Sequence, residues 1–161
     1  MKCLLAPVAV VAALAIAGCG SSSTLSTEQF TGLQSPGKQF ATSVQNVGAD
    51  ASSCAAAGKG ANTSPDATIV RTCLADALGK LQAGLTKMID YTNNLSREVD
   101  GSCSSELKAF SGSVTALKAT LATAETQARK GDLTEMQTTL QSIKSTDVTS
   151  AGAAAEKACK A

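Results

Sequence analysis

The sequence contains no histidine and no tryptophan, and its only aromatic residues are one tyrosine and three phenylalanines. Without histidine the chain cannot supply Ser-His-Asp or Cys-His catalysis, cytochrome-type haem ligation, or histidine-containing zinc and di-iron sites. It has no Gly-rich phosphate-binding loop, and so few aromatic residues argue against platforms that stack on sugars or bases. The sequence therefore predicts a protein that is not an enzyme and binds no cofactor or metal ion.

Charge of either sign is also limited, and the two signs nearly cancel. The chain has 14 Lys and Arg against 13 Asp and Glu, a net charge of +1. No basic stripe is interleaved with aromatic residues, so we expect no nucleic-acid partner. Leu, Ile, Val and Phe together form only about 17% of residues 19–161. A core this thin is expected to need covalent support.

The first 23 residues have the pattern of an export signal. Lys2 is followed by an apolar run at 4–16, about 13 residues long and therefore too short for a membrane-spanning helix. Small residues then lead to a cysteine in Ile16-Ala17-Gly18-Cys19, and a Ser-rich stretch follows. These residues resemble a bacterial lipoprotein signal peptide.

The resemblance implies a lipid anchor on Cys19. It implies a diacylglycerol on the Cys19 sulfur, cleavage before Cys19 and, in many bacteria, acylation of the new amino group with palmitate or a similar fatty acid. Two acyl chains are enough for stable anchoring. The expected location is the bacterial cell envelope, and Gly20 favours the periplasmic face of the outer membrane in a two-membrane cell. The alternative is an ordinary secretory peptide cut after Ala17.

The rest of the chain reads as one helical unit behind a short tether. We expect a signal peptide at 1–18, then at 19–34 the lipidated Cys19 and a Ser/Thr-rich tether, and a helical bundle at 35–161. Ser26 and Gln29 have the spacing of a capping box, which predicts a short helix to about residue 34.

Apolar residues recur at spacings of three and four along the bundle region. Helices are predicted at 36–57, at 65–100, at 102–130 and from Asp132 towards residue 158, with box-like helix-start spacing at 132–135. The second of these helices could run unbroken to Asp100, or it could kink or break at Asn93-Asn94. We expect a bend in the last segment within 145–150. Short connections favour an all-α, antiparallel up-down four-helix bundle.

Four cysteines remain once Cys3 is removed and Cys19 carries lipid. An even number in an oxidising compartment predicts two disulfides, with a four-thiolate metal site as the alternative. An up-down bundle places the members of each pair at the same end, and opposite ends are too far apart to be bridged. The predicted pairs are Cys54–Cys73 and Cys103–Cys159. The tether enters at the second pair, so the first pair and the loop at 58–66 should point away from the membrane.

Two polar groups could carry chemistry. Tyr91-Thr92-Asn93-Asn94 could line a ligand site beside a helix break, or it could be a solvent-facing stretch of a long helix. Glu98 and Asp100 could act as an acid–base pair, or they could be solvated charges at a helix end.

The function expected from these features is that of a non-catalytic, lipid-anchored envelope lipoprotein. Its bundle would act as a structural or protein-interaction module, with the membrane bound through lipid on Cys19 and an unknown protein as partner. Two alternatives remain open. One is a periplasmic inhibitor or immunity-type protein that blocks a toxic or lytic enzyme, and the other is a carrier of a small apolar ligand.

Overall fold

The computed structural model describes residues 24–29, 31–32, 42, 53–54, 67–143 and 145–160. The predicted signal peptide, Cys19, most of the helix predicted at 36–57 and the loop at 58–66 lie outside these residues. The described residues include the helices α2 (Ala67–Glu98), α3 (Gly101–Lys130), α4 (Leu133–Gln141) and α5 (Ser145–Cys159). They contain no strand, and the all-α class predicted from the sequence is confirmed.

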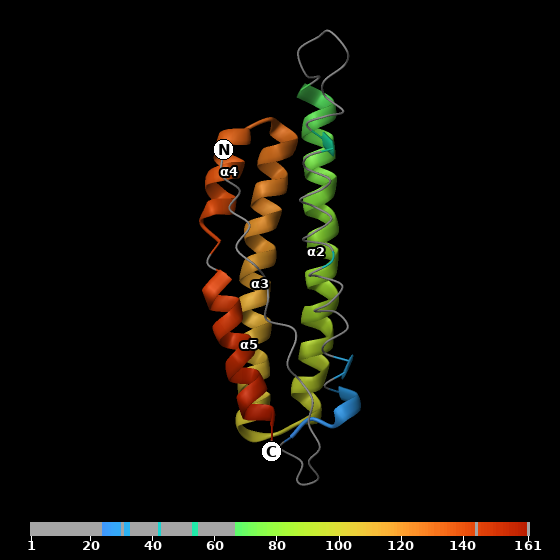
Figure 1. Ribbon diagram of the computed structural model, residues 1–161, viewed down its shortest axis with the longest axis vertical. Helices are drawn as coiled ribbons and strands as arrows, with labels where there is room; N and C mark the ends of the chain where they lie inside the picture. Colours follow the sequence, from blue (N-terminus) through green and yellow to red (C-terminus); the bar gives the residue numbers. More distant parts are fainter. Residues whose placement is uncertain are drawn as a thin grey trace.

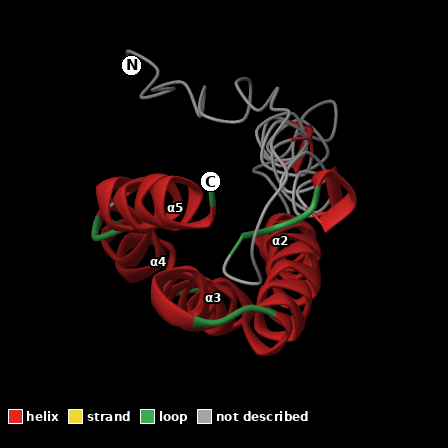
Figure 2. Cartoon of the chain, turned by 90° about the horizontal axis from the view of Figure 1, so that it is seen from below, coloured by secondary structure: helices red, strands yellow, loops and turns green. Residues whose placement is uncertain are grey.

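The helix α3 lies at the centre of the arrangement. The helices α2 and α3 form an antiparallel hairpin, and α4 and then α5 run back along α3 (Figure 1). Seen end-on, they form an arc in which α3 packs against α2 on one side and against α4 and α5 on the other, while α2 packs against neither α4 nor α5 (Figure 2). We call the end with the α2–α3 turn and Cys159 the base, and the end with the α3–α4 turn the distal end.

The helix α2 runs without interruption through Asn93-Asn94, which decides for the continuous helix where the sequence left a kink open. Asparagine costs a helix less than about 1 kcal/mol relative to alanine. The neighbouring side chains of Thr92, Leu95 and Ser96 are buried, and packing of this kind outweighs a small local preference.

A glycine with positive φ lies at each end of α3. Gly131 has a left-handed φ of 90°, and its N–H donates to the carbonyls of Gln127 and Ala128, which confirms the predicted stop after Lys130. At the other end Gly101, with φ 64°, opens α3, one residue before the predicted start. The helix α4 begins at Leu133 as expected, but the side chain of Asp132 makes no capping hydrogen bond.

The bend in the last helical segment lies earlier than predicted. We expected it within 145–150, but α4 ends at Gln141 and α5 already begins at Ser145. Ser142 closes the last turn of α4, because its N–H donates to the carbonyls of Thr138 and Thr139 and its Oγ also donates to the Thr139 carbonyl.

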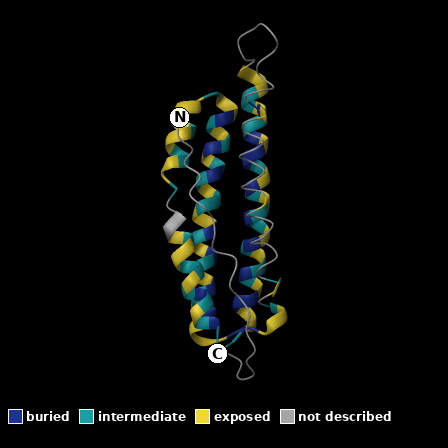
Figure 3. Cartoon of the chain, viewed as in Figure 1, coloured by how far each residue is buried: buried dark blue, intermediate teal, exposed yellow. Residues whose placement is uncertain are grey.

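The core consists of two clusters, and buried positions recur along α2 and α3 (Figure 3). The larger cluster fills the distal and middle parts and contains Ala75, Leu78, Leu81, Leu85, Met88, Val114, Leu121, Ala124 and Ala128. The second, which we call the base cluster, contains Leu25, Leu95, Val99, Cys103, Leu107, Ala155 and Cys159. The presence of Leu25 in it shows that the segment before the bundle is part of the folded structure.

Both disulfides have the predicted pairing. Cys54 bonds to Cys73 in the second turn of α2, with 5.6 Å between their Cα atoms. Cys103 at the start of α3 bonds to Cys159 at the end of α5, with Cα atoms 4.6 Å apart. One bridge therefore lies toward the distal end of α2 and the other at the base.

Candidate functional site

A short N-terminal segment is fastened across the base of the bundle. We call its described residues, 24–29 and 31–32, the clasp. The backbone N–H of Leu25 donates to the carbonyl of Cys159 at 3.3 Å, and the Leu25 side chain is 8% exposed within the base cluster. Burying a leucine contributes about 1.5–3 kcal/mol, which offsets part of the entropy lost in ordering the segment against the end of α5.

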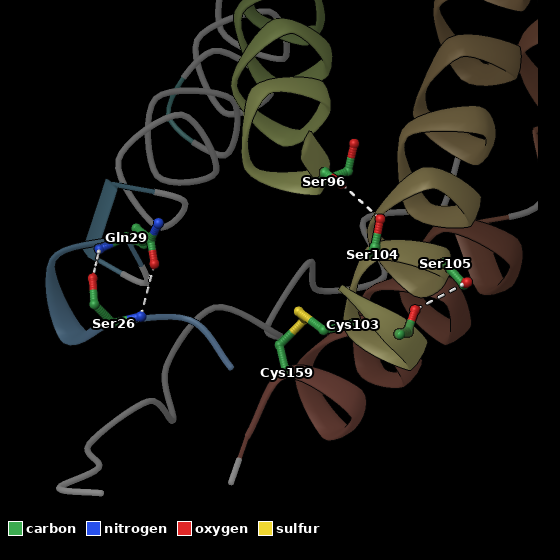
Figure 4. Close-up of a disulfide and its surroundings, with 8 residues drawn as sticks. Ser26, Gln29, Ser96, Cys103, Ser104, Ser105 and Cys159 are labelled. Atoms are coloured by element: carbon green, nitrogen blue, oxygen red, sulfur yellow. Dashed lines mark hydrogen bonds between the residues drawn. A yellow bond between two sulfur atoms is a disulfide. The ribbon is translucent and has the colours of Figure 1, made fainter. Parts of the chain in front are cut away.

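The predicted capping box shapes the clasp. The Ser26 N–H donates to Gln29 Oε1 at 2.8 Å, and the Gln29 N–H donates back to Ser26 Oγ at 3.2 Å (Figure 4). These reciprocal bonds start a helical turn that includes residues 27–29 and 31–32. The turn places the side chain and the carbonyl of Gln29 next to the last turns of α2.

Gln29 connects the clasp to α2 in two ways. Its Nε2 donates to Glu98 Oε2 at 2.8 Å, and its carbonyl accepts a 3.0 Å hydrogen bond from the Tyr91 hydroxyl. Gly32 lies against the same tyrosine, because a Cβ atom built on Gly32 would overlap the Tyr91 hydroxyl. A glycine at 32 is thus what lets the clasp approach α2 this closely.

The environment of Tyr91 keeps its hydroxyl protonated. Burial raises the pKa of Tyr91 above its ordinary value, and the negative charge of Glu98 raises that pKa further. The hydroxyl therefore remains a hydrogen-bond donor to Gln29 throughout the neutral and mildly alkaline range.

A disulfide and a hydrogen bond join the helix ends that lie beneath the clasp. Cys103 and Cys159 are 0% and 1% exposed, and their disulfide joins α3 to α5 (Figure 4) within the cluster that also contains Leu25. The buried Ser104 Oγ donates to the Ser96 carbonyl at 2.6 Å, which ties α3 to α2. The clasp thus rests on three helices whose ends are joined to one another.

Glu98 and Asp100 are exposed at the end of α2, as expected for solvated charges at a helix end, whereas the stretch from Tyr91 to Asn94 is neither beside a helix break nor wholly solvent-facing. Tyr91 holds the clasp, and Thr92 is completely buried with no hydrogen-bond partner for its hydroxyl. Glu98 accepts the bond from Gln29, while Asp100 is exposed and precedes α3. The sequence showed the capping box, but no local signal linked Gln29 to Tyr91, because they are 62 positions apart.

The distal end carries a different surface. An open groove of about 560 Å³ lies beside the Cys54–Cys73 disulfide and is lined by Ser53, Thr68, Ile69, Thr72, Cys73, Asp76 and Lys80. Among the described residues the exposed large hydrophobic side chains are Ile69 and Leu133. They begin α2 and α4, so both lie at this end.

An exposed ion-pair group links α2 and α3 near the groove. Arg129 Nη2 lies 2.8 Å from Glu125 Oε1 and 3.4 Å from Asp76 Oδ1, and Glu125 also accepts from the Gln82 side-chain amide. Pairs this exposed add little to stability. Their effect is to orient the side chains along this side of the hairpin.

Within the described part of the chain, no group of three or more potential metal ligands comes together. No helix there combines the length and the apolarity needed to cross a membrane. No protein-family model, curated protein or solved structure matches the chain.

Proposed function

We propose that the protein is a non-catalytic lipoprotein of the bacterial cell envelope, anchored by lipid on Cys19 and acting through its helical bundle as a structural or protein-interaction module. The clasp carries this proposal. It attaches the segment that follows Cys19 to the folded base, and Cys19 precedes Thr24 by five positions. An extended chain covers at most about 18 Å over that distance, so lipid on Cys19 would hold the base at a membrane.

We further propose that the chain between the clasp and Cys54 completes an antiparallel four-helix bundle. The clasp lies at the base, whereas Cys54 is bonded to Cys73 near the distal end, so residues 33–53 connect the two ends. As a helix, residues 32–54 would extend about 33 Å, close to the roughly 38 Å between Cys73 and Glu98 along α2. The helix α2 packs against neither α4 nor α5, which leaves room beside α2 for this additional helix.

The distal end supports the protein-interaction part of the proposal. The exposed hydrophobic residues Ile69 and Leu133 lie at the end opposite the anchor, where a partner can reach them. Ile69 also lines the groove beside the Cys54–Cys73 disulfide, and a groove with an exposed apolar side chain offers a partner a place to bind. An inhibitor of a lytic enzyme would use the same surface, and stoichiometric recovery of one hydrolase with the purified protein would identify that role.

The mass of the mature N-terminus tests the anchor. We expect envelope preparations to yield a chain that begins at Cys19 and carries a diacylglycerol, and that floats with outer-membrane lipid in a two-membrane cell. The Cys19→Ala variant should accumulate as an uncleaved precursor without lipid. An unmodified chain beginning at Gly18 would contradict the proposal and indicate an ordinary secreted protein.

A further inference from the structure

The geometry of the clasp points to an upright orientation on the membrane. We propose that the docked clasp keeps the tether from the lipid anchor short and fixes where it leaves the bundle, so that the base faces the lipid headgroups and the distal end points away from them. This inference rests on the proposed lipidation of Cys19, and it adds an orientation that a longer, undocked tether would not impose.

The first argument is the length of free chain. With the clasp docked, Thr24 follows Cys19 by five positions, and a flexible segment of that length has an average end-to-end distance of about 12 Å. With the clasp released, at least 13 residues would be free, and the average distance would rise to about 20 Å. Docking therefore keeps the base closer to the bilayer than a free tether would.

The second argument is that the clasp is attached on both sides of the base. Leu25 bonds to Cys159 at the end of α5, while Gln29 bonds to Tyr91 and Glu98 in the last turns of α2. The helices α2 and α5 do not pack against each other, so the clasp spans two separate supports. A segment held at two separated points cannot pivot about either one, so the tether leaves the bundle at a fixed place on the base.

The third argument is the distribution of exposed side chains. The exposed large hydrophobic residues of the described chain, Ile69 and Leu133, lie at the distal end, and the base has none. A polar base can rest against hydrated headgroups, whereas the hydrophobic pair is directed away from them. The helix α2 has 32 residues and is about 48 Å long. The distal end would then stand about 50–65 Å from the headgroups.

Resonance energy transfer to labelled lipids tests this orientation. An introduced cysteine is the only free thiol in the lipidated protein, because Cys19 carries lipid and the other four cysteines are in disulfides. The exposed positions Ser102, at the base, and Lys130, at the distal end, are suitable. Each variant, Ser102→Cys or Lys130→Cys, would carry a donor dye and be reconstituted in phosphatidylcholine vesicles with acceptor on the headgroups.

An upright bundle predicts several-fold more energy transfer from position 102 than from position 130. Leu25→Asp should release the clasp and bring the two values together. Tyr91→Phe should bring the two transfer values part of the way together. Circular dichroism verifies that each variant folds. The surface substitution Thr123→Ala should leave the ratio unchanged.

Equal transfer from the two positions in the lipidated protein with an intact clasp would overturn the upright orientation alone. A difference that survives Leu25→Asp would show that the clasp does not cause it. Protein that lacks the lipid by mass, and does not float with the vesicles, would instead overturn the proposed function and the orientation with it.

Discussion

The Tyr91 hydroxyl donates a 3.0 Å hydrogen bond to the backbone carbonyl of Gln29, 62 positions earlier in the chain. Tyr91 is the only tyrosine, and the chain has no tryptophan. The near-ultraviolet signal of Tyr91 therefore reports on the contact between the clasp and α2, and no other tyrosine or tryptophan contributes to it.

Tyr91→Phe should weaken the clasp without disturbing the core. The change removes one hydrogen bond and keeps the ring, so we expect a loss of about 0.5–1.5 kcal/mol in the free energy of unfolding, measured by urea denaturation. Thr123→Ala is the matched control, since that exposed hydroxyl bonds only to the Ala119 carbonyl, and its effect should stay within about 0.5 kcal/mol. Equal stability of Tyr91→Phe and the native protein would argue that the bond contributes nothing.

Alkaline pH should release the clasp. The pKa of Tyr91 is raised in the folded state above its ordinary value of 10.0, so folding favours the protonated form. The stabilisation is complete below pH 10 and is lost as the pH rises through the folded-state pKa. We expect Tyr91 to ionise at higher pH in the native protein than in urea, as followed by its absorbance. Ionisation at the same pH in both states would contradict the buried contact with Gln29.

The base disulfide should contribute more stability than the distal one. Cys103 and Cys159 are 56 positions apart, whereas Cys54 and Cys73 are 19 apart. The chain-entropy argument gives about 4 kcal/mol for the larger loop and about 3 kcal/mol for the smaller one. Each pair would be replaced by serines and the unfolding free energies compared. The variant without the base disulfide should also lose protection of the Leu25 amide in hydrogen exchange, whereas the other variant should keep it.

Alanine should be tolerated less well at Gly131 than at Gly101. Both glycines have positive φ, which costs a residue with a side chain about 1–2 kcal/mol. At Gly131 the added Cβ would also lie 2.9 Å from an Arg71 side-chain nitrogen and 3.0 Å from Arg71 Cδ, whereas nothing lies within 4 Å at Gly101. Thermal unfolding should therefore show the larger drop for Gly131→Ala, and the reverse order would show that Arg71 moves aside without cost.

Thr92→Val should stabilise the protein. The Thr92 hydroxyl is completely buried and has no hydrogen-bond partner, and leaving such a group unpaired costs about 1–3 kcal/mol. Valine has nearly the same shape, so we expect a gain of about 1 kcal/mol in denaturant unfolding. Ser96→Ala is the contrasting change, because that hydroxyl donates to the Asn93 carbonyl and its removal should not stabilise. A destabilised Thr92→Val would indicate that the hydroxyl binds a buried water molecule.

The sequence patterns predicted the features that depend only on residues close together in the chain. Glycine after Arg129-Lys130 ends α3, and the Ser26–Gln29 spacing makes a capping box. The disulfide pairing also followed, because it needs only the direction of successive helices. The continuity of α2 through Asn93-Asn94 and the early break before Ser145 depend on tertiary packing and on backbone bonds of Ser142. The contact of Gln29 with Tyr91 depends on how the folded ends meet, which no window of sequence contains.

The consecutive order of the two disulfides bears on how the chain matures. In a chain exported N-terminus first, as proposed above, Cys54 emerges before Cys73, and these two are native partners. Cys103 emerges next and finds its partner in Cys159, two residues before the last residue of the sequence. Pairing each cysteine with the next to appear therefore gives the native bonds without reshuffling. The clasp bonds to the Cys159 carbonyl through Leu25, so it can dock on α5 only after the last helix has emerged, although it lies at the start of the described chain.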